Sequence, residues 1–227
     1  MARLADPDMQ YLFFEAYEHR RLLQTRYEDD DSGPTGPIVC CVDVSRSMNT
    51  PAALGKERFL WAKAVALAIA DAAKQMKRPF VGICFSSEHD VAEFRLPRGD
   101  GWAEEAVAMA ACDFDGGTNF RAPLERALAS VKQAPAKGGH IVFITDGEAA
   151  LPDRFRRRFT QQKAELETRL ITVFIDGRHE ELASISDAVV DVSSQRRGSW
   201  ETAVAGVGGL LTRRGRGSVT SGTRCDD

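Results

Sequence analysis

The sequence predicts a doubly wound α/β fold, in which a mostly parallel six-stranded sheet with one antiparallel edge strand carries helices on both faces. Along residues 38–211, short apolar segments alternate with longer segments of helical periodicity. Segments 37–44, 79–85 and 140–146 are nearly continuous apolar runs, as is typical of parallel strands buried on both faces. Right-handed crossovers between such strands place helices on both sides of the sheet.

The first half of this region predicts three strands. Residues 37–44 (PIVCCVDV) form the first strand, and the alanine-rich segment 56–76 forms the helix that follows it. Residues 79–85 (PFVGICF) and 91–96 (VAEFRL) are separated only by the polar segment SSEHD, so we expect them to form a hairpin. The other predicted elements of this half are helices at 102–112 and 122–131.

The second half predicts three more strands and two helices. The strands lie at 140–146 (HIVFITD), 169–176 (RLITVFID) and 187–192 (DAVVDV), and the helices at 153–166 and 199–211. In the first of these helices, the run RFRRRF places Phe155 and Phe159 four residues apart, so we expect both rings to face the core. Contact of the arginines with an acidic partner or nucleic acid is the alternative interpretation of this run.

Two regions outside the predicted domain, 37–212, differ from it in composition. Residues 1–36 combine a helical segment with an acidic linker rich in glycine and proline, YEDDDSGPTGP. Residues 213–227 are rich in Gly, Ser and Arg, and we expect them to be disordered. The aromatic side chains of the N-terminal segment can either pack on the domain or dock on a partner.

Composition excludes several classes of function. A formal net charge of −3 argues against nucleic acid or an anionic membrane as the main partner. The sequence has neither a signal-peptide pattern at its start nor an apolar run of about 18 residues, so we expect a cytoplasmic protein. The five cysteines form no Cys-x-x-Cys pair, and we expect reduced core thiols, with Cys40 and Cys41 on opposite faces of their strand.

Oxygen-donor side chains occur in three of the predicted loops. Asp43, Ser45 and Ser47 end the first strand, Thr118 lies in the loop DFDGGTNF, and Asp146 ends the fourth strand. In open α/β sheets, ligands bind at the carboxyl ends of the strands, so we expect these side chains to meet there. Mg²⁺ takes such oxygen ligands. An extended Asp-x-Ser-x-Ser loop would point its three side chains to one side.

Turn and helix-cap hydrogen bonding is the alternative explanation, because Ser and Asp favour such positions. It accounts for any one of the three motifs, whereas a metal site accounts for all three together. The three motifs also resemble those of the von Willebrand factor A domain family, in that family's chain order and strand context. DVSRS resembles its Asp-x-Ser-x-Ser motif, the threonine of GGTNF its second loop, and ITDGE its third.

The resemblance implies a metal-ion-dependent adhesion site that binds Mg²⁺, with Mn²⁺ as a substitute. In the family pattern, Ser45, Ser47 and Thr118 bind the ion directly or nearly so. Asp43 and Asp146 bind it directly or through water. The open coordination position is commonly filled by a carboxylate of a bound partner.

Three residues next to these motifs are expected to form a partner-binding rim: Arg46, Asn119 and Glu148. Arg46 stands where the family often has glycine. Its side chain should face away from the ion, where it can pair with an acidic group of the partner.

An A domain preceded by a charged helical segment and a Gly-Pro pair also resembles the C-terminal domain of the ViaA and CoxE type. Those proteins work with a MoxR-type AAA+ ATPase. The resemblance implies an intracellular adaptor that links such an ATPase to a client protein.

The sequence lacks the usual motifs of hydrolytic enzymes, so we expect no catalytic residues. LGKER at 54–58 lacks the leading glycine and the Ser or Thr of a phosphate-binding loop, and no Gly-x-Ser-x-Gly elbow is present. The alternative is a metal-dependent hydrolase acting on a phosphoester-like substrate, with Glu148 as its candidate base. We expect His89 and His140 to be surface residues and not ligands.

Overall fold

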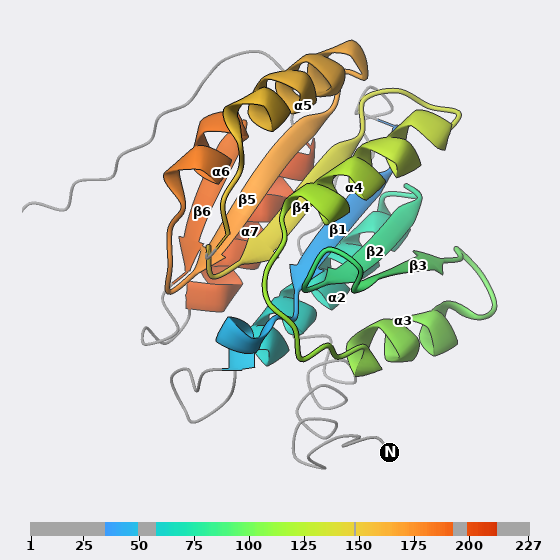
Figure 1. The fold of residues 1–227 in the computed structure, drawn as a ribbon. Coiled ribbons are helices and arrows are strands. Elements are labelled where there is room, and N and C mark those ends of the chain that lie inside the picture. Colours follow the sequence, from blue (N-terminus) through green and yellow to red (C-terminus); the bar gives the residue numbers. More distant parts are fainter. Residues whose placement is uncertain (1–34, 50–57, 148, 193–198, 213–227) are drawn as a thin grey trace, which may run out of the picture.

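A computed structural model of the protein describes residues 35–49, 58–147, 149–192 and 199–212. These residues contain one six-stranded sheet of order β3-β2-β1-β4-β5-β6 (Figure 1). Neighbouring strands are parallel except β2 and β3, which form an antiparallel hairpin. The strands are β1 (Ile38–Asp43), β2 (Phe80–Phe85), β3 (Val91–Leu96), β4 (His140–Thr145), β5 (Arg169–Ile175) and β6 (Ala188–Val192). The predicted fold class is confirmed.

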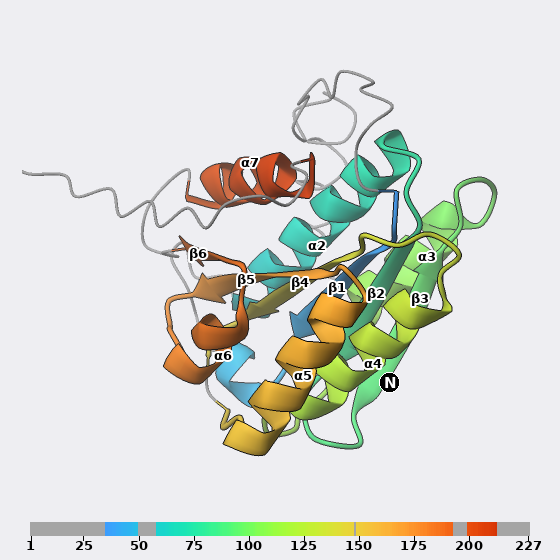
Figure 2. The same ribbon diagram turned by 90° about the horizontal axis from the view of Figure 1, so that it is seen from above.

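Helices cover both faces of the sheet, as Figure 2 shows. One face carries α2 (Arg58–Gln75), α3 (Trp102–Ala111) and α7 (Ser199–Thr212), and the other carries α4 (Arg121–Gln133), α5 (Asp153–Glu165) and α6 (Glu180–Ile185). The described ends of the predicted helices agree with these bounds to within two residues. Helix α6 was not predicted, because six residues are too few to show a helical period.

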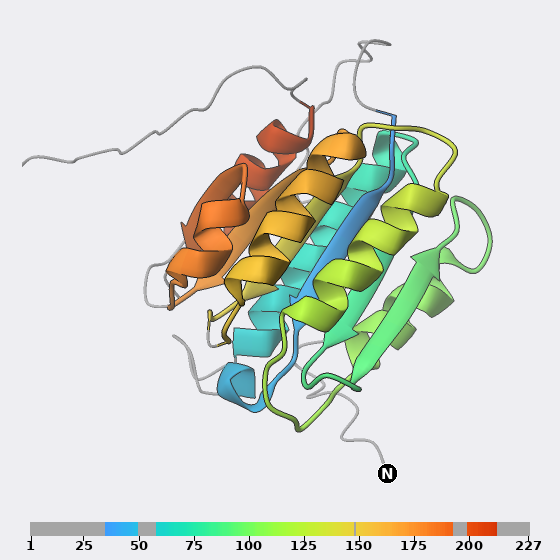
Figure 3. The same ribbon diagram turned by 45° about the horizontal axis from the view of Figure 1, so that its top comes forward.

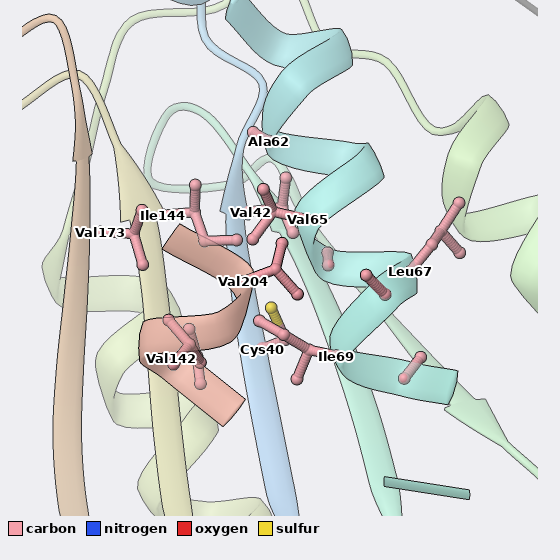
Figure 4. Close-up of a cluster of buried hydrophobic side chains, with 14 of the residues drawn as sticks. Cys40, Val42, Ala62, Val65, Leu67, Ile69, Val142, Ile144, Val173 and Val204 are labelled. Carbon is pink, nitrogen blue, oxygen red and sulfur yellow. The ribbon is translucent and has the colours of Figure 1, made fainter. Parts of the chain in front are cut away.

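The predicted N-terminal helix and the predicted disordered tail lie outside the described residues, so both stay predictions. Within the described part, the domain packs its strands between two apolar layers. Cys40 and Val42 of β1 face Val65 and Ile69 of α2 (Figure 4). Cys41 faces the opposite layer, which confirms the predicted alternation. The four described cysteines are free thiols.

The second layer is built around aromatic rings. Phe143 of β4 packs against Phe85 and Phe120, with ring centroids 5.0 and 5.3 Å apart. The predicted inward pair of α5, Phe155 and Phe159, is also buried here, with the two rings stacked. Because side chains of the central strands are buried on both faces, their sequences are continuous apolar runs without a polar alternation.

The sheet order places a topological switch point between β1 and β4. The chain proceeds from β1 to β2 and β3 on one side and then returns to β4 on the other side of β1. In open α/β sheets, the loops diverge at such a point and leave a crevice at the carboxyl ends of the strands. The end of β1, the loops after β1 and β4, and the loop between α3 and α4 hold the predicted metal ligands.

A buried arginine lies at the opposite end of the sheet, where the central parallel strands begin. Arg78 donates from Nε to the carbonyl oxygen of Gly36 at 2.8 Å and from Nη1 to that of Leu211 at 3.1 Å. Its Nη2 lies 2.9 Å from Nδ1 of His140. The guanidinium therefore joins the segment before β1, the end of α7 and the start of β4.

The prediction that His140 lies on the surface is wrong, because its side chain is buried at the start of a central strand. His89 is exposed, as expected. Since a guanidinium has only donors, Nδ1 of His140 accepts from Arg78 and the ring is neutral. Burial, and then the charges of Arg78 and Arg169, lower the pKa of His140 to about 3.

We predict that His140 makes the protein sensitive to acid. Below about pH 6.5 the unfolded chain binds a proton on this ring that the folded chain does not, so the stabilisation present above pH 6.5 is lost as the pH falls toward 3. The free energy of unfolding of the wild type, minus that of His140→Gln, should fall by roughly 1.4 kcal/mol per pH unit between pH 6 and 4. Urea denaturation at each pH measures it.

Glutamine at position 140 keeps an acceptor for Arg78, so the comparison isolates the imidazole. His89→Gln is the matched control at an exposed position, where replacement should change stability by no more than about 0.5 kcal/mol. A difference between wild type and His140→Gln that stays constant with pH would contradict the prediction.

Candidate functional site

Three loops meet at the carboxyl end of β1. The 3-10 helix η1 (Arg46–Asn49) follows the arrowhead of β1 in Figure 3, beside the loop that leads into α4. The backbone N–H of Arg46 donates to the carbonyl oxygen of Gly116 at 3.1 Å, and that of Asn119 donates to Ser86 at 2.7 Å. These two bonds fix the loop that contains Thr118 against the ends of β1 and β2.

Asp43 joins the ends of the two central strands. Its Oδ1 accepts the backbone N–H of Ser45 at 2.9 Å, and its Oδ2 accepts the hydroxyl of Thr145 at 2.6 Å. The same Thr145 oxygen accepts the backbone N–H of Gly147 at 3.0 Å. Thr145 was not among the predicted site residues, although its place at the carboxyl end of β4, next to Asp146, is a signal that the sequence contains.

The loop after β1 is not extended, which corrects the expectation that Asp-x-Ser-x-Ser runs as an extended chain. The backbone N–H of Met48 donates to the carbonyl oxygen of Ser45 at 3.1 Å, so the chain forms a 3-10 turn. The hydroxyl oxygens of Ser45 and Ser47 nevertheless lie 3.1 Å apart. The turn itself brings the two serine side chains together.

Asp146 directly follows β4, and its carboxylate is buried. Within the described residues, neither carboxylate oxygen accepts a hydrogen bond. Nη1 of Arg58 lies 3.5 Å from Oδ2, which is within ion-pair distance but is not a hydrogen bond. The loop after β5 approaches closely, since a Cβ on Gly177 would lie 1.7 Å from the carbonyl oxygen of Asp146. Only glycine fits at position 177.

The charge of Asp146 acts on Asp43. The pKa of Asp43 is raised from 3.8 to about 6, chiefly by burial and in smaller part by the negative charge of Asp146. The hydrogen bonds from Ser45 and Thr145 act in the opposite direction, because they favour the charged form of the Asp43 carboxylate. Two buried carboxylates in one place disfavour full ionisation unless a cation joins them.

The donor set fits a hard divalent cation. Nowhere in the described residues do three His, Cys, Asp or Glu side chains form a group suited to a metal. A site at this edge therefore combines two carboxylates with hydroxyls, and such oxygen donors suit Mg²⁺ better than Zn²⁺. Asp43, Ser45 and Asp146 are buried, whereas Ser47 and Thr118 are half-buried.

The structure places two of the three predicted rim residues. Arg46 is exposed, and its Nε pairs with Asp115 at 3.0 Å in the neighbouring loop. Asn119 accepts the backbone N–H of Ala122 on its Oδ1 at 3.0 Å, and so caps the first turn of α4. Glu148 lies outside the described residues.

Comparison with known proteins agrees with the observed fold. Residues 38–148 match the family model of the von Willebrand factor type A domain. The chain contains a von Willebrand factor type A domain. The VWA domain of SpRpn10 superposes with a TM-score of 0.63 at 13% identity, over 74% of this chain and 94% of that one. BatB from Bacteroides thetaiotaomicron gives a TM-score of 0.57 at 14% identity, over 77% and 98%.

Two curated proteins of Methanocaldococcus jannaschii are related in sequence. The uncharacterised protein MJ0811 is 32% identical over 85% of this chain and 43% of its own length. The uncharacterised protein MJ0077 is 30% identical over 69% of this chain and 37% of its own. The chain thus spans less than half the length of either relative.

Von Willebrand factor A domains are generally modules for protein–protein interaction and generally are not enzymes. Among the helices of the described residues, none combines the length and apolar character needed to cross a membrane. The family thus gives the general role of the domain.

We predict that Asp43 destabilises the metal-free domain at neutral pH. Because its folded pKa is raised from 3.8 to about 6, its favourable contribution is present below pH 3.8 and is lost as the pH rises through 6. In EDTA at pH 7.5, Asp43→Asn should therefore be more stable than wild type by roughly 1–3 kcal/mol. That advantage should shrink as the pH falls from 6 to 4.

Urea denaturation across this pH range measures the effect. Asp115→Asn is the matched control, because its carboxylate is exposed and the change should alter stability by no more than about 0.5 kcal/mol. An Asp43→Asn protein less stable than wild type at pH 7.5 in EDTA would contradict the prediction.

Proposed function

We propose that this domain is a Mg²⁺-dependent protein-binding module whose partner supplies an acidic side chain to the bound ion. The observation that carries the proposal is the buried carboxylate of Asp146, beside Asp43, with neither of its oxygens hydrogen-bonded within the described residues. Mn²⁺ should substitute, because it accepts the same oxygen ligands. The residues proposed to hold the ion are Asp43, Ser45, Ser47, Thr118 and Asp146.

The proposed ligands have different roles in binding the ion. Asp43 and Asp146 would balance the charge of the ion, and the adjacent hydroxyls of Ser45 and Ser47 would add ligands without adding charge. Ser47 and Thr118 are half-buried, so they are the proposed ligands most accessible to a partner. When bound, Mg²⁺ supplies a positive centre that attracts a carboxylate of the partner.

The partner we propose is a MoxR-type AAA+ ATPase or its client, with the domain as a cytoplasmic adaptor between them. The resemblance to the ViaA and CoxE type supports this choice of partner. The exposed pair of Arg46 and Asp115, which lies beside the loop of Thr118, gives the partner charged groups of both signs at the rim.

We propose no enzymatic activity for the domain. The sequence offers neither a phosphate-binding loop nor a Gly-x-Ser-x-Gly elbow that would support catalysis. The general character of the family supports the same conclusion. The hydrolase alternative requires Glu148 as its base, and it predicts turnover of a phosphoester by the isolated protein.

We predict that Mg²⁺ stabilises the wild-type domain through these ligands. At about a hundred times its dissociation constant, a ligand adds roughly 2.7 kcal/mol, which corresponds to a rise in melting temperature of roughly 5–10 °C for a domain of this size. Asp146→Asn and Thr118→Val should show no such rise. Thr160→Val, at an exposed position of α5, is the matched control and should respond as wild type does.

Scanning calorimetry in EDTA and in increasing Mg²⁺ gives these values. A rise of equal size in wild type and Asp146→Asn would show that the ion binds elsewhere and would contradict the proposed ligand set.

We predict that partner binding requires the same site. The immobilised domain should bind a purified MoxR-type AAA+ ATPase in Mg²⁺, and biolayer interferometry should show affinity at least about tenfold weaker in EDTA or for Thr118→Val. Binding that is unchanged by EDTA and by the substitution would overturn the mechanism. Turnover of p-nitrophenyl phosphate that requires Mg²⁺ and is lost in Asp146→Asn would instead favour the hydrolase.

A further inference from the structure

Arg58, the first residue of α2, contacts the candidate metal site from outside the predicted motifs. Its Nη1 lies 3.5 Å from Oδ2 of Asp146, and the arginine side chain is 21% exposed. The Asp146 side chain is only 1% exposed, so the guanidinium is a positive charge next to a buried carboxylate. The proposed function described above assigns no role to this residue.

A second carboxylate holds Arg58 in this position. Nε of Arg58 donates to Oδ2 of Asp176 at 3.3 Å. Asp176 directly follows β5 and has a backbone φ of 55°, a left-handed conformation that aspartate tolerates better than most residues. Its backbone N–H donates to Val192 at 2.9 Å, which fixes the residue against β6. The ends of β4 and β5 thus present one carboxylate each to the same guanidinium.

The contact with Asp146 differs from the contact with Asp176. The guanidinium makes a hydrogen bond to Asp176, whereas it meets Asp146 by charge attraction without hydrogen-bond geometry. A charge attraction of this kind compensates the buried carboxylate without using its oxygen lone pairs. Both oxygens of Asp146 therefore remain available as ligands.

We infer that Arg58 is a built-in counter-cation of the metal site, which neutralises Asp146 in the metal-free domain and opposes the binding of a divalent ion. Arginine keeps its charge at every physiological pH, so its repulsion of the ion is permanent. At separations of a few ångströms near a protein surface, such a repulsion is large enough to change affinity severalfold. The inference rests on the proposed function, because it requires Asp146 to be a ligand of the ion.

This arrangement couples the ion to the acidic partner. With Arg58 present, the guanidinium offsets part of the negative charge of Asp43 and Asp146, and the ion offsets the rest. A carboxylate from the partner adds the negative charge that the arginine has offset, so ion and partner should each strengthen the binding of the other. Arg58 thereby makes the site depend on its partner.

The test compares Arg58→Gln with wild type by isothermal titration with Mg²⁺ and with Mn²⁺. The variant should bind either ion about tenfold more tightly, because one positive charge near the site is gone. In EDTA it should melt at a lower temperature than wild type, because Asp146 has lost its counter-charge. Saturating Mg²⁺ should remove that difference in melting temperature.

Three further variants sharpen the comparison. Arg98→Gln is the matched control, because it makes the same change of charge at an exposed position. Arg98 lies just beyond β3, at the end of the sheet away from the candidate site. It should bind the ions as wild type does. Arg58→Met removes the charge with a different side chain, so the conclusion does not depend on the folding of one variant. Arg58→Lys keeps the charge and should not gain affinity.

The outcomes separate the two claims. If neither wild type nor the Arg58 variants bind a divalent ion, the proposed metal-dependent function fails, and the inference fails with it. If wild type binds and both uncharged variants bind equally or more weakly, the role of Arg58 is overturned while the metal site stands. Tighter binding by both, together with the lower melting temperature in EDTA, supports the counter-cation role.

Discussion

The geometry of the candidate site is organised around one buried carboxylate at the junction of the two central strands. Asp43 has no exposed surface, and its two oxygens accept hydrogen bonds from the turn after β1 and from the last residue of β4. Burial of a charged group is unfavourable unless hydrogen bonds or an opposite charge compensate it. The turn that places Ser45 and Ser47 side by side and the position of Thr145 both follow from this requirement.

Buried charged groups occur at both ends of the central strands. At the carboxyl edge, the carboxylates of Asp43 and Asp146 lie at the ends of adjacent strands, and Arg58 offsets part of their charge. At the other edge, Arg78 binds backbone carbonyls and the neutral ring of His140. The first arrangement leaves oxygen atoms available to a ligand, whereas the second uses its donors to hold the chain together. The candidate site thus lies at the end of the strands where the buried charge is incompletely compensated.

Much of the fold could be predicted from local sequence. Continuous apolar runs identified the buried strands, and the spacing of Phe155 and Phe159 identified the inward face of α5. The burial of His140 could not be predicted in this way, because a strand start is exposed or covered according to its neighbours. The 3-10 turn after β1 was also missed, since Asp-x-Ser-x-Ser is compatible with an extended chain until Asp43 binds the backbone of Ser45.

The sequence by itself determined which residue types stand at the strand ends, because an apolar run followed by oxygen-donor side chains can be recognised within a short segment of the chain. It also determined the family, through three motifs that occur in the right order. Only the tertiary structure decided that Arg58 meets Asp146 and Asp176, and that Thr145 supports Asp43. These contacts join segments distant in the chain, and they follow from the order of the strands, which hydrophobic periodicity does not specify.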